Sequence, residues 1–242
     1  MLERVSLFYL RDVMFATLEP VMKQLTMIDT LICLQDKELH DFITEAGVLP
    51  YYSLSWVITW CSHDLDNLEQ ISRLFDLFLT SNPLILIYFS AAVVLSKKEQ
   101  VLALPCDTST VHSFLTKLPS DLDVSWLCKK SVDLSRMYSV YEVQCKSTIA
   151  LDQFSAVNRF QVDWLGIETA EDLNENVGRV IRLTREEKHD KPVELVTTKA
   201  NEPTHSMLNR LLKNKKDLYR VFTLSATVGI IAFWIANSGL IK

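Results

Sequence analysis

Apolar residues in the N-terminal part of the chain recur three or four positions apart, which is typical of amphipathic helices. Residues 3–25 follow this spacing, and Pro20 is expected to kink or break the helix there. Residues 25–34 form a second short apolar segment. A further helix is predicted over residues 38–46, and Gly47 is expected to end it.

The strongest apolar segments lie in the middle of the chain. Residues 53–62 predict either a helix or a strand, because their periodicity alone does not decide between them. Asp66 is expected to cap the next helix, with Glu69 three positions later as in a capping box. Residues 83–95 are apolar on nearly all sides but too few to cross a bilayer, so we expect them to form a central buried helix.

Two more helices complete the predicted domain. Asp107 or Thr108 is expected to cap one that ends at Pro119, and residues 120–130 predict another. Signals for β-strands are sparse. The pattern therefore predicts an all-α fold of stacked helices over residues 1–135. Charges of both signs then interleave without a period, which predicts a mostly flexible polar tether over residues 136–217.

The end of the chain has a different character. Residues 221–241 carry no charge, and about 20 apolar residues suffice to cross a bilayer as a helix. The sequence predicts a single C-terminal transmembrane helix over residues 218–241, with a buried core helix as the alternative. The apolar residues expected to form this anchor are Val221, Phe222, Leu224, Val228, Ile230, Ile231, Phe233, Trp234 and Ile235.

A basic cluster lies directly before this segment, and it predicts which side of the membrane the domain occupies. Its members are Arg210, Lys213, Lys215, Lys216 and Arg220. Since such flanks stay cytosolic, the N-terminal domain is expected in the cytosol. Binding of anionic lipid is a second reading of the cluster. Charges near the N-terminus exclude a signal peptide, so insertion would follow translation.

Composition excludes several function classes. A net charge of −5 does not favour binding of nucleic acid, which is itself negatively charged. Nucleotide-binding folds use glycine-rich phosphate loops, so a chain with 5 glycines is not expected to have one. The 5 cysteines are scattered without a CxxC pair, which indicates a reducing compartment rather than a disulfide or zinc scaffold. We therefore expect neither a metal nor another cofactor.

Few side chains in the apolar middle suggest chemistry. Cys61 and His63 are imaginable as a metal site or a Cys–His pair, but alternate helical positions face apart and no second ligand cluster exists. Trp56 and Trp60 lie four positions apart, which favours core packing over a ligand cage.

The same region carries a family resemblance. The motifs are S-W-x-x-T-W at residues 55–60, R-L-F-D at 73–76, Y-F-S-A-A at 88–92 and, upstream, Y-L-R-D at 9–12. Residues 51–95 resemble the C-terminal half of a TBC domain, the all-helical module that activates Rab GTPases. With the C-terminal anchor, the chain is most similar to the tail-anchored members of the endoplasmic reticulum and Golgi.

This resemblance implies a Rab-type GTPase as partner and a role in traffic between these organelles. The family supplies an arginine finger and a glutamine finger from the motifs I-x-x-D-x-x-R and Y-x-Q. Neither occurs here: Ile149 and Asp152 are followed by Ser155 where arginine is required, and no tyrosine has glutamine two positions later. We therefore expect no catalytic residue in this chain, which begins inside the family's domain and lacks its catalytic half.

Two arginines remain as surrogate fingers, Arg73 and Arg11, but a surface position or an ion pair for Arg73, and pairing with Asp12 or a neighbouring helix for Arg11, account for them better. Three hypotheses follow for the chain. It is a truncated Rab-directed activator, an inactive membrane-anchored module that binds a Rab or acts as an adaptor, or a non-productive isoform whose exposed apolar surface leads to degradation.

Overall fold

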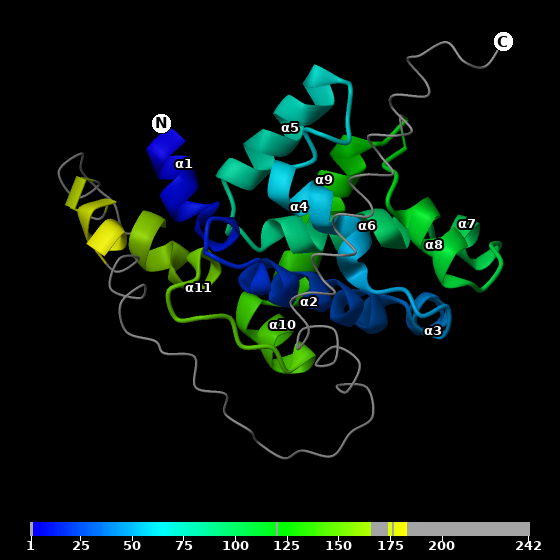
Figure 1. Ribbon diagram of the computed structural model, residues 1–242. Coiled ribbons are helices and arrows are strands. Elements are labelled where there is room, and N and C mark those ends of the chain that lie inside the picture. The colour runs from blue at the N-terminus through cyan, green and yellow to red at the C-terminus, as the bar shows by residue number, and fades with distance from the viewer. Residues whose placement is uncertain (1, 120, 166–173, 176, 183–242) are drawn as a thin grey trace, which may run out of the picture. The chain divides into compact units, whose positions relative to one another are not determined.

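A buried central helix organises the computed structural model, which describes residues 2–119, 121–165, 174–175 and 177–182 (Figure 1). The described part of the chain contains helices and no strand, which confirms the all-α prediction. Its elements are α1 (Leu2–Phe8), η1 (Arg11–Val13), α2 (Glu19–Gln35), α3 (Lys37–Glu45), η2 (Pro50–Ser53), α4 (Leu54–Thr59), α5 (Leu68–Leu79), α6 (Ile85–Ser96), α7 (Lys98–Leu102), α8 (Thr108–Leu115), α9 (Val124–Met137), α10 (Val140–Ser147), α11 (Ala156–Phe160) and the π-helical turn η3 (Gln161–Leu165).

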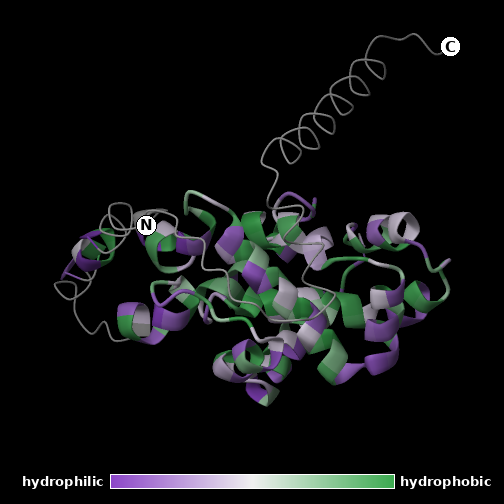
Figure 2. Ribbon diagram, turned by 60° about the horizontal axis from the view of Figure 1, so that its bottom comes forward, coloured by the Kyte–Doolittle hydropathy of each residue, from purple (hydrophilic) through white to green (hydrophobic). Residues whose placement is uncertain are grey.

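Helix α6 is the centre of the core. All of its residues from Ile85 to Val94 are buried, and the helix packs mainly against α9 and α2. A helix that is apolar on every side gains most when other elements surround it completely. In Figure 2 hydrophobic positions gather in the central helices, and hydrophilic positions lie mostly on outward faces. The predicted central buried helix is confirmed.

Helix α2 corrects the prediction for the N-terminal segment. Pro20 occupies the first turn of this helix instead of kinking one, since the N–H that proline lacks has no partner in a first turn. Residues 25–34 continue the same helix. Asp36 ends α2 and also caps α3, accepting a hydrogen bond from the Leu39 backbone N–H at 3.0 Å.

Gly47 follows the C-cap of α3 and ends this helical segment, as predicted. Its φ of +69° lies in the left-handed region, and an added Cβ would come within 3.3 Å of Thr108 Oγ1. That hydroxyl donates to the Ala46 carbonyl, so the turn after α3 is tied to the start of α8. Asp107 is the N-cap of α8, because its side chain accepts the Thr110 N–H.

Residues 53–62 are helical in their first half and irregular afterwards. Helix α4 ends where Trp60 and Cys61 take φ values of 53° and 62°. This turn points the Trp60 ring towards Phe75 and Phe78 of α5, with ring centroids 5.3 and 5.8 Å away. Aromatic contacts in the core fix the left-handed turn at a position where local propensity does not favour it.

The cap of α5 differs from the prediction. Asn67 is the N-cap, since its side-chain oxygen accepts from the backbone N–H of Glu69 and Gln70. Asp66 lies one residue too early and is exposed. Aspartate and asparagine both suit an N-cap, so the residue at which the helix begins decides which of the two caps it.

The helical packing continues past residue 135, where the sequence predicts the domain to end. Helix α9 begins at Val124 and runs to Met137, and α10 then packs against α2. A capping box of Ser139 and Glu142 starts α10. The Tyr88 hydroxyl of α6 donates to the Tyr138 carbonyl at 2.6 Å, which holds the α9–α10 turn on the core.

Candidate functional site

Arg11, one of the two candidate fingers, is buried in an ion cluster. It is 5% exposed, and its guanidinium donates to the Asp163 carboxylate of η3 at 3.2 Å. Arg159 and Arg179 also donate to Asp163, at 3.0 and 3.1 Å. One carboxylate therefore binds three arginines. This geometry confirms an ion pair with a neighbouring element as the role of Arg11.

Asp12, the next residue of the Y-L-R-D motif, anchors a second set of hydrogen bonds. Gln24 of α2 donates to its carboxylate at 2.6 Å, the Ala156 backbone N–H donates at 3.0 Å, and the Ser155 hydroxyl donates as well. Burial raises the pKa of Asp12, while these donors work in the opposite direction. Together Arg11 and Asp12 hold α11 and η3 against the N-terminal elements.

Aromatic rings surround this polar cluster. The Tyr9 ring lies 5.7 Å from the rings of both Phe160 and Trp164, and the Phe8 ring lies 5.5 Å from Trp164. The Y-L-R-D motif is thus a structural junction between α1, η1 and α11. It offers no arginine to a partner molecule, since Arg11 is shielded on all sides.

Arg73, the other candidate finger, lies exposed on α5. Its neighbours Leu74 and Phe78 are buried and fix the helix on the core. Arg73 is near Cys128 of α9: burial raises the pKa of that thiol, and the positive charge of Arg73 acts against this rise. The structure does not bring Arg73 together with Arg11 or with another candidate residue.

The remaining candidates from the sequence are core residues or isolated. Trp56 and Trp60 are buried, as the core-packing interpretation predicts. Cys61 is buried, which raises the pKa of its thiol, whereas His63 is exposed. The described residues contain no group of His, Cys, Asp or Glu side chains arranged to hold a metal ion.

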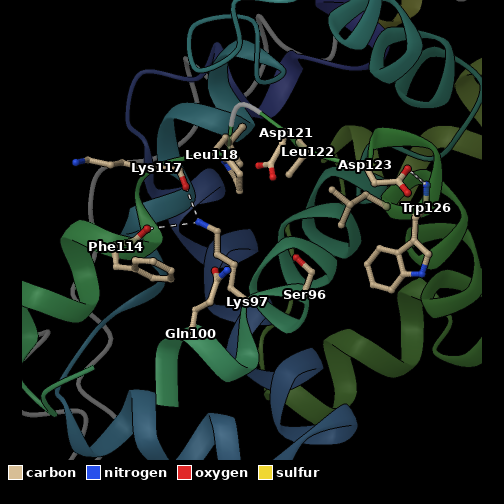
Figure 3. Close-up of a pocket in the computed structure, with 12 residues that line it drawn as sticks. Ser96, Lys97, Gln100, Phe114, Lys117, Leu118, Asp121, Leu122, Asp123 and Trp126 are labelled. Atoms are coloured by element: carbon tan, nitrogen blue, oxygen red, sulfur yellow. Dashed lines mark hydrogen bonds between the residues drawn. The ribbon is translucent and has the colours of Figure 1, made fainter. Parts of the chain in front are cut away.

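A surface cavity of about 460 Å³, missed by the sequence analysis, opens beside the end of α6 (Figure 3). Helices α6 to α9 and the loop after α8 all contribute to its wall. Lys97 lies at its base and donates to the backbone carbonyls of Phe114, at 3.4 Å, and of Lys117. Lys97 and Lys98 follow the apolar helix in sequence, but no local pattern indicates that their partners lie on other helices.

Lys98 has a different environment from its neighbour. Its ammonium pairs with Asp36 at 2.7 Å and with Glu38 at 2.9 Å, which raises its pKa. Burial instead lowers the pKa of Lys97 to about 8. Two adjacent lysines therefore tie the start of α7 to different elements, Lys97 to the end of α8 and Lys98 to the junction of α2 and α3.

The predicted anchor and the basic cluster lie outside the described residues. This applies to residues 221–241 and to the cluster between residues 210 and 220. Among the helices that the structure describes, none combines the length and the apolar character that a membrane crossing requires.

The fold therefore defines a domain of stacked helices around one buried helix, and comparison with known proteins shows what this domain is similar to. Residues 1–102 match the model of the Rab-GTPase-TBC domain. Over 134 residues the chain is 37% identical to "GTPase-activating protein gyp10" of Schizosaccharomyces pombe. It is equally similar, 37% over 134 residues, to "TBC1 domain family member 20" of Bos taurus and of Homo sapiens.

These matches show that the N-terminal helical region is similar to the Rab-GTPase-TBC domain. They cover 54–55% of this chain but only 33–36% of the relatives. The chain thus spans about a third of the length of the curated relatives it matches.

Proposed function

We propose that this chain works with Rab-type small GTPases, as part of the GTPase-activating class to which its relatives belong. The observation that carries the proposal is the match of residues 1–102 to the Rab-GTPase-TBC domain. The similarity to "GTPase-activating protein gyp10" supports it. The described helices α1 to α7 give this region a packed core on which a GTPase surface can dock.

The proposal includes a limit on catalysis. An activating protein that supplies an arginine in trans accelerates GTP hydrolysis by ~10³–10⁵. The family's finger motifs do not occur in the 242 residues, and Arg11 is held by Asp163 in the core. We therefore propose that the chain corresponds to the C-terminal half of the domain and binds a Rab without accelerating hydrolysis by itself.

Two measurements on the full chain in phosphatidylcholine nanodiscs test this. Binding to a panel of Rab GTPases is measured with GDP, with a non-hydrolysable GTP analogue and with GDP–aluminium fluoride. Single-turnover GTP hydrolysis is measured on the same panel. We expect binding to at least one Rab and hydrolysis within about twofold of the intrinsic rate, since the family's finger motifs do not occur in the sequence. Failure to bind any Rab contradicts the partner, and acceleration of ~10³ or more contradicts the limit on catalysis.

An inactive membrane-anchored module that binds a Rab or serves as an adaptor is the alternative. Its mark is a stable endogenous protein of the chain's own mass, 27.8 kDa. An antibody against residues 158–217 distinguishes the two on an immunoblot. A band only well above this mass favours a longer activating protein, and a stable band at this mass favours the module.

We further propose a single C-terminal membrane anchor over residues 221–241, with the helical domain in the cytosol. Support comes from the uncharged segment and the preceding basic cluster. Its residence in the endoplasmic reticulum or Golgi rests on the resemblance alone.

Membrane extraction tests the anchor. The full chain is expected to stay in the membrane pellet after alkaline carbonate washing, whereas deletion of residues 221–241 releases it. Replacing the five basic residues between 210 and 220 by glutamine is the control, since a spanning helix holds without them. Release of the full chain by carbonate, or retention of the deletion variant, contradicts the anchor.

A further inference from the structure

The cavity beside α6 has the dimensions of a binding site. Its volume of about 460 Å³ falls within the usual ~300–1,000 Å³ of ligand pockets. Figure 3 shows Phe114 and Trp126 on opposite sides of it, and Leu118 and Leu127 also line it. Figure 3 shows the Trp126 indole beside the cavity at the start of α9. Trp126 is 46% exposed. Tryptophan is one of the residue types that contribute most to binding energy at protein interfaces.

The base of the cavity is polar but does not favour an anion. Lys97 is 4% exposed, and its ammonium lies 5.1 Å from the Phe114 ring centroid. Its two carbonyl acceptors belong to the end of α8 and the residues after it, where a helix carries partial negative charge. These carbonyls offset the positive charge. An ammonium has three N–H groups, so one remains for a further carbonyl acceptor.

The rim of the cavity is acidic. Asp121 is exposed, and the described residues provide it with no hydrogen-bond partner or ion pair. Asp123 is exposed too and uses one carboxylate oxygen to cap α9 through the Trp126 N–H at 2.9 Å. Figure 3 shows the Lys117 side chain extending away from the cavity. Two carboxylates therefore border the apolar walls, while the Lys97 ammonium at the base is directed at backbone carbonyls.

We propose that this cavity binds a short extended segment of a partner protein that carries an apolar side chain flanked by lysine or arginine. The apolar side chain fills the space between Phe114, Leu118 and Trp126. The flanking cation pairs with Asp121 and Asp123, because their charges are complementary. A backbone carbonyl of the segment accepts the remaining N–H of Lys97. This site is independent of Rab activation and does not rest on the proposed function.

Peptide titration tests the proposal with the full chain in phosphatidylcholine nanodiscs. The probe is an acetylated, amidated peptide Lys-Leu-Ile-Arg, a sequence that the chain itself does not contain, and the comparison peptide is Asp-Leu-Ile-Glu. Binding is followed by calorimetry and by the change in tryptophan fluorescence, of which the part due to Trp126 is the part lost in Trp126→Ala. We expect the basic peptide to bind at least tenfold more tightly than the acidic one, and its affinity to fall as salt is raised. Equal affinity for both peptides, or no binding of the basic one, overturns the proposal.

Variants separate this cavity from non-specific attraction. Asp121→Lys is expected to weaken binding of the basic peptide at least tenfold, and Trp126→Ala likewise. Glu45→Lys is the matched control, since it makes the same change of charge at an exposed site on α3 that does not line the cavity. Circular dichroism verifies folding, and Asp121→Asn replaces Asp121→Lys if the latter unfolds. An equal loss in the control variant, or no loss in the Asp121 variant, overturns the assignment.

Discussion

At the scale of single residues, an ion cluster joins distant parts of the chain. Arg11 and Asp163 are 152 positions apart and are both buried. Asp163 pairs with three arginines. Among the described residues, the carboxylate that Arg11 pairs with is Asp163. Loss of Asp163 therefore leaves Arg11 without an ion pair, whereas loss of Arg11 leaves Asp163 with two arginine partners.

This asymmetry predicts unequal effects of mutation. Asp163→Asn should lower the free energy of unfolding by about 3–5 kcal/mol, because it leaves a buried guanidinium without its counter-charge. Arg11→Met should lower it by about 1–2 kcal/mol, since Asp163 keeps Arg159 and Arg179. Urea unfolding of both variants measures the difference. Equal losses would contradict the asymmetry.

Asp29 gives a second prediction at this scale. It lies half-buried on α2 without a hydrogen bond in the described structure, and burial raises its pKa from 3.8 to about 7. A carboxyl with a raised folded-state pKa makes the native state less stable as pH rises from about 4 to 7. The penalty is absent below this window and complete above it.

Asp29→Asn should therefore stabilise the protein at pH 8 and have little effect at pH 4. We expect about 1–2 kcal/mol at pH 8, less than the full shift implies, because water still reaches part of the side chain. The urea midpoints of the variant and the original chain are compared at both pH values. A difference that does not change with pH would refute this role of Asp29.

At the scale of elements, the start of α5 shows how a cap is chosen. Asp66 and Asn67 are adjacent, and both residue types cap helices well. The buried positions Leu74 and Phe78 fix the rotation and the start of the helix on the core. That start places Asn67, not Asp66, where its side chain reaches the free N–H groups.

Replacing each residue by alanine tests this assignment. Asn67→Ala should lower the free energy of unfolding by about 0.5–2 kcal/mol, because two backbone N–H groups lose their acceptor. Asp66→Ala serves as the control and should change it by less than about 0.5 kcal/mol. Thermal or urea unfolding decides between them, and a larger effect at Asp66 would restore the sequence-based cap.

At the scale of the whole molecule, α11 and η3 complete the helical unit although they follow the region that matches the family. They cover Phe8 and Tyr9 and supply the partners of Arg11 and Asp12. Without them, apolar surface and two charged groups of the N-terminal elements become exposed or lose their partners. The domain therefore needs residues far beyond residue 102.

A truncation series follows from this. A chain that ends at residue 154 should lose at least about 4 kcal/mol of unfolding free energy, since buried Val157 and Phe160 are removed together with the partners of Arg11. A chain that ends at residue 190, the boundary of the compact unit, should stay within about 1 kcal/mol of the full chain. Urea unfolding followed by circular dichroism compares the three, and equal stability of both truncations would contradict the junction.

Sequence alone determined the helical class, the buried centre and several caps. Residues 83–95 are apolar on every side, and such a helix is stable in a folded domain only when it is enclosed. Asp107 and Gly47 carry local signals that act within one turn, so they were predicted correctly.

Only the tertiary structure decided which distant groups meet. The partner of Arg11, the acceptors of Lys97 and the cavity above it arise between residues 17 to 152 positions apart, and no periodic pattern encodes such distances. The turn at Trp60 likewise depends on rings from α5. Propensity and periodicity act over a few residues, whereas these contacts are selected by the packing of whole helices against α6.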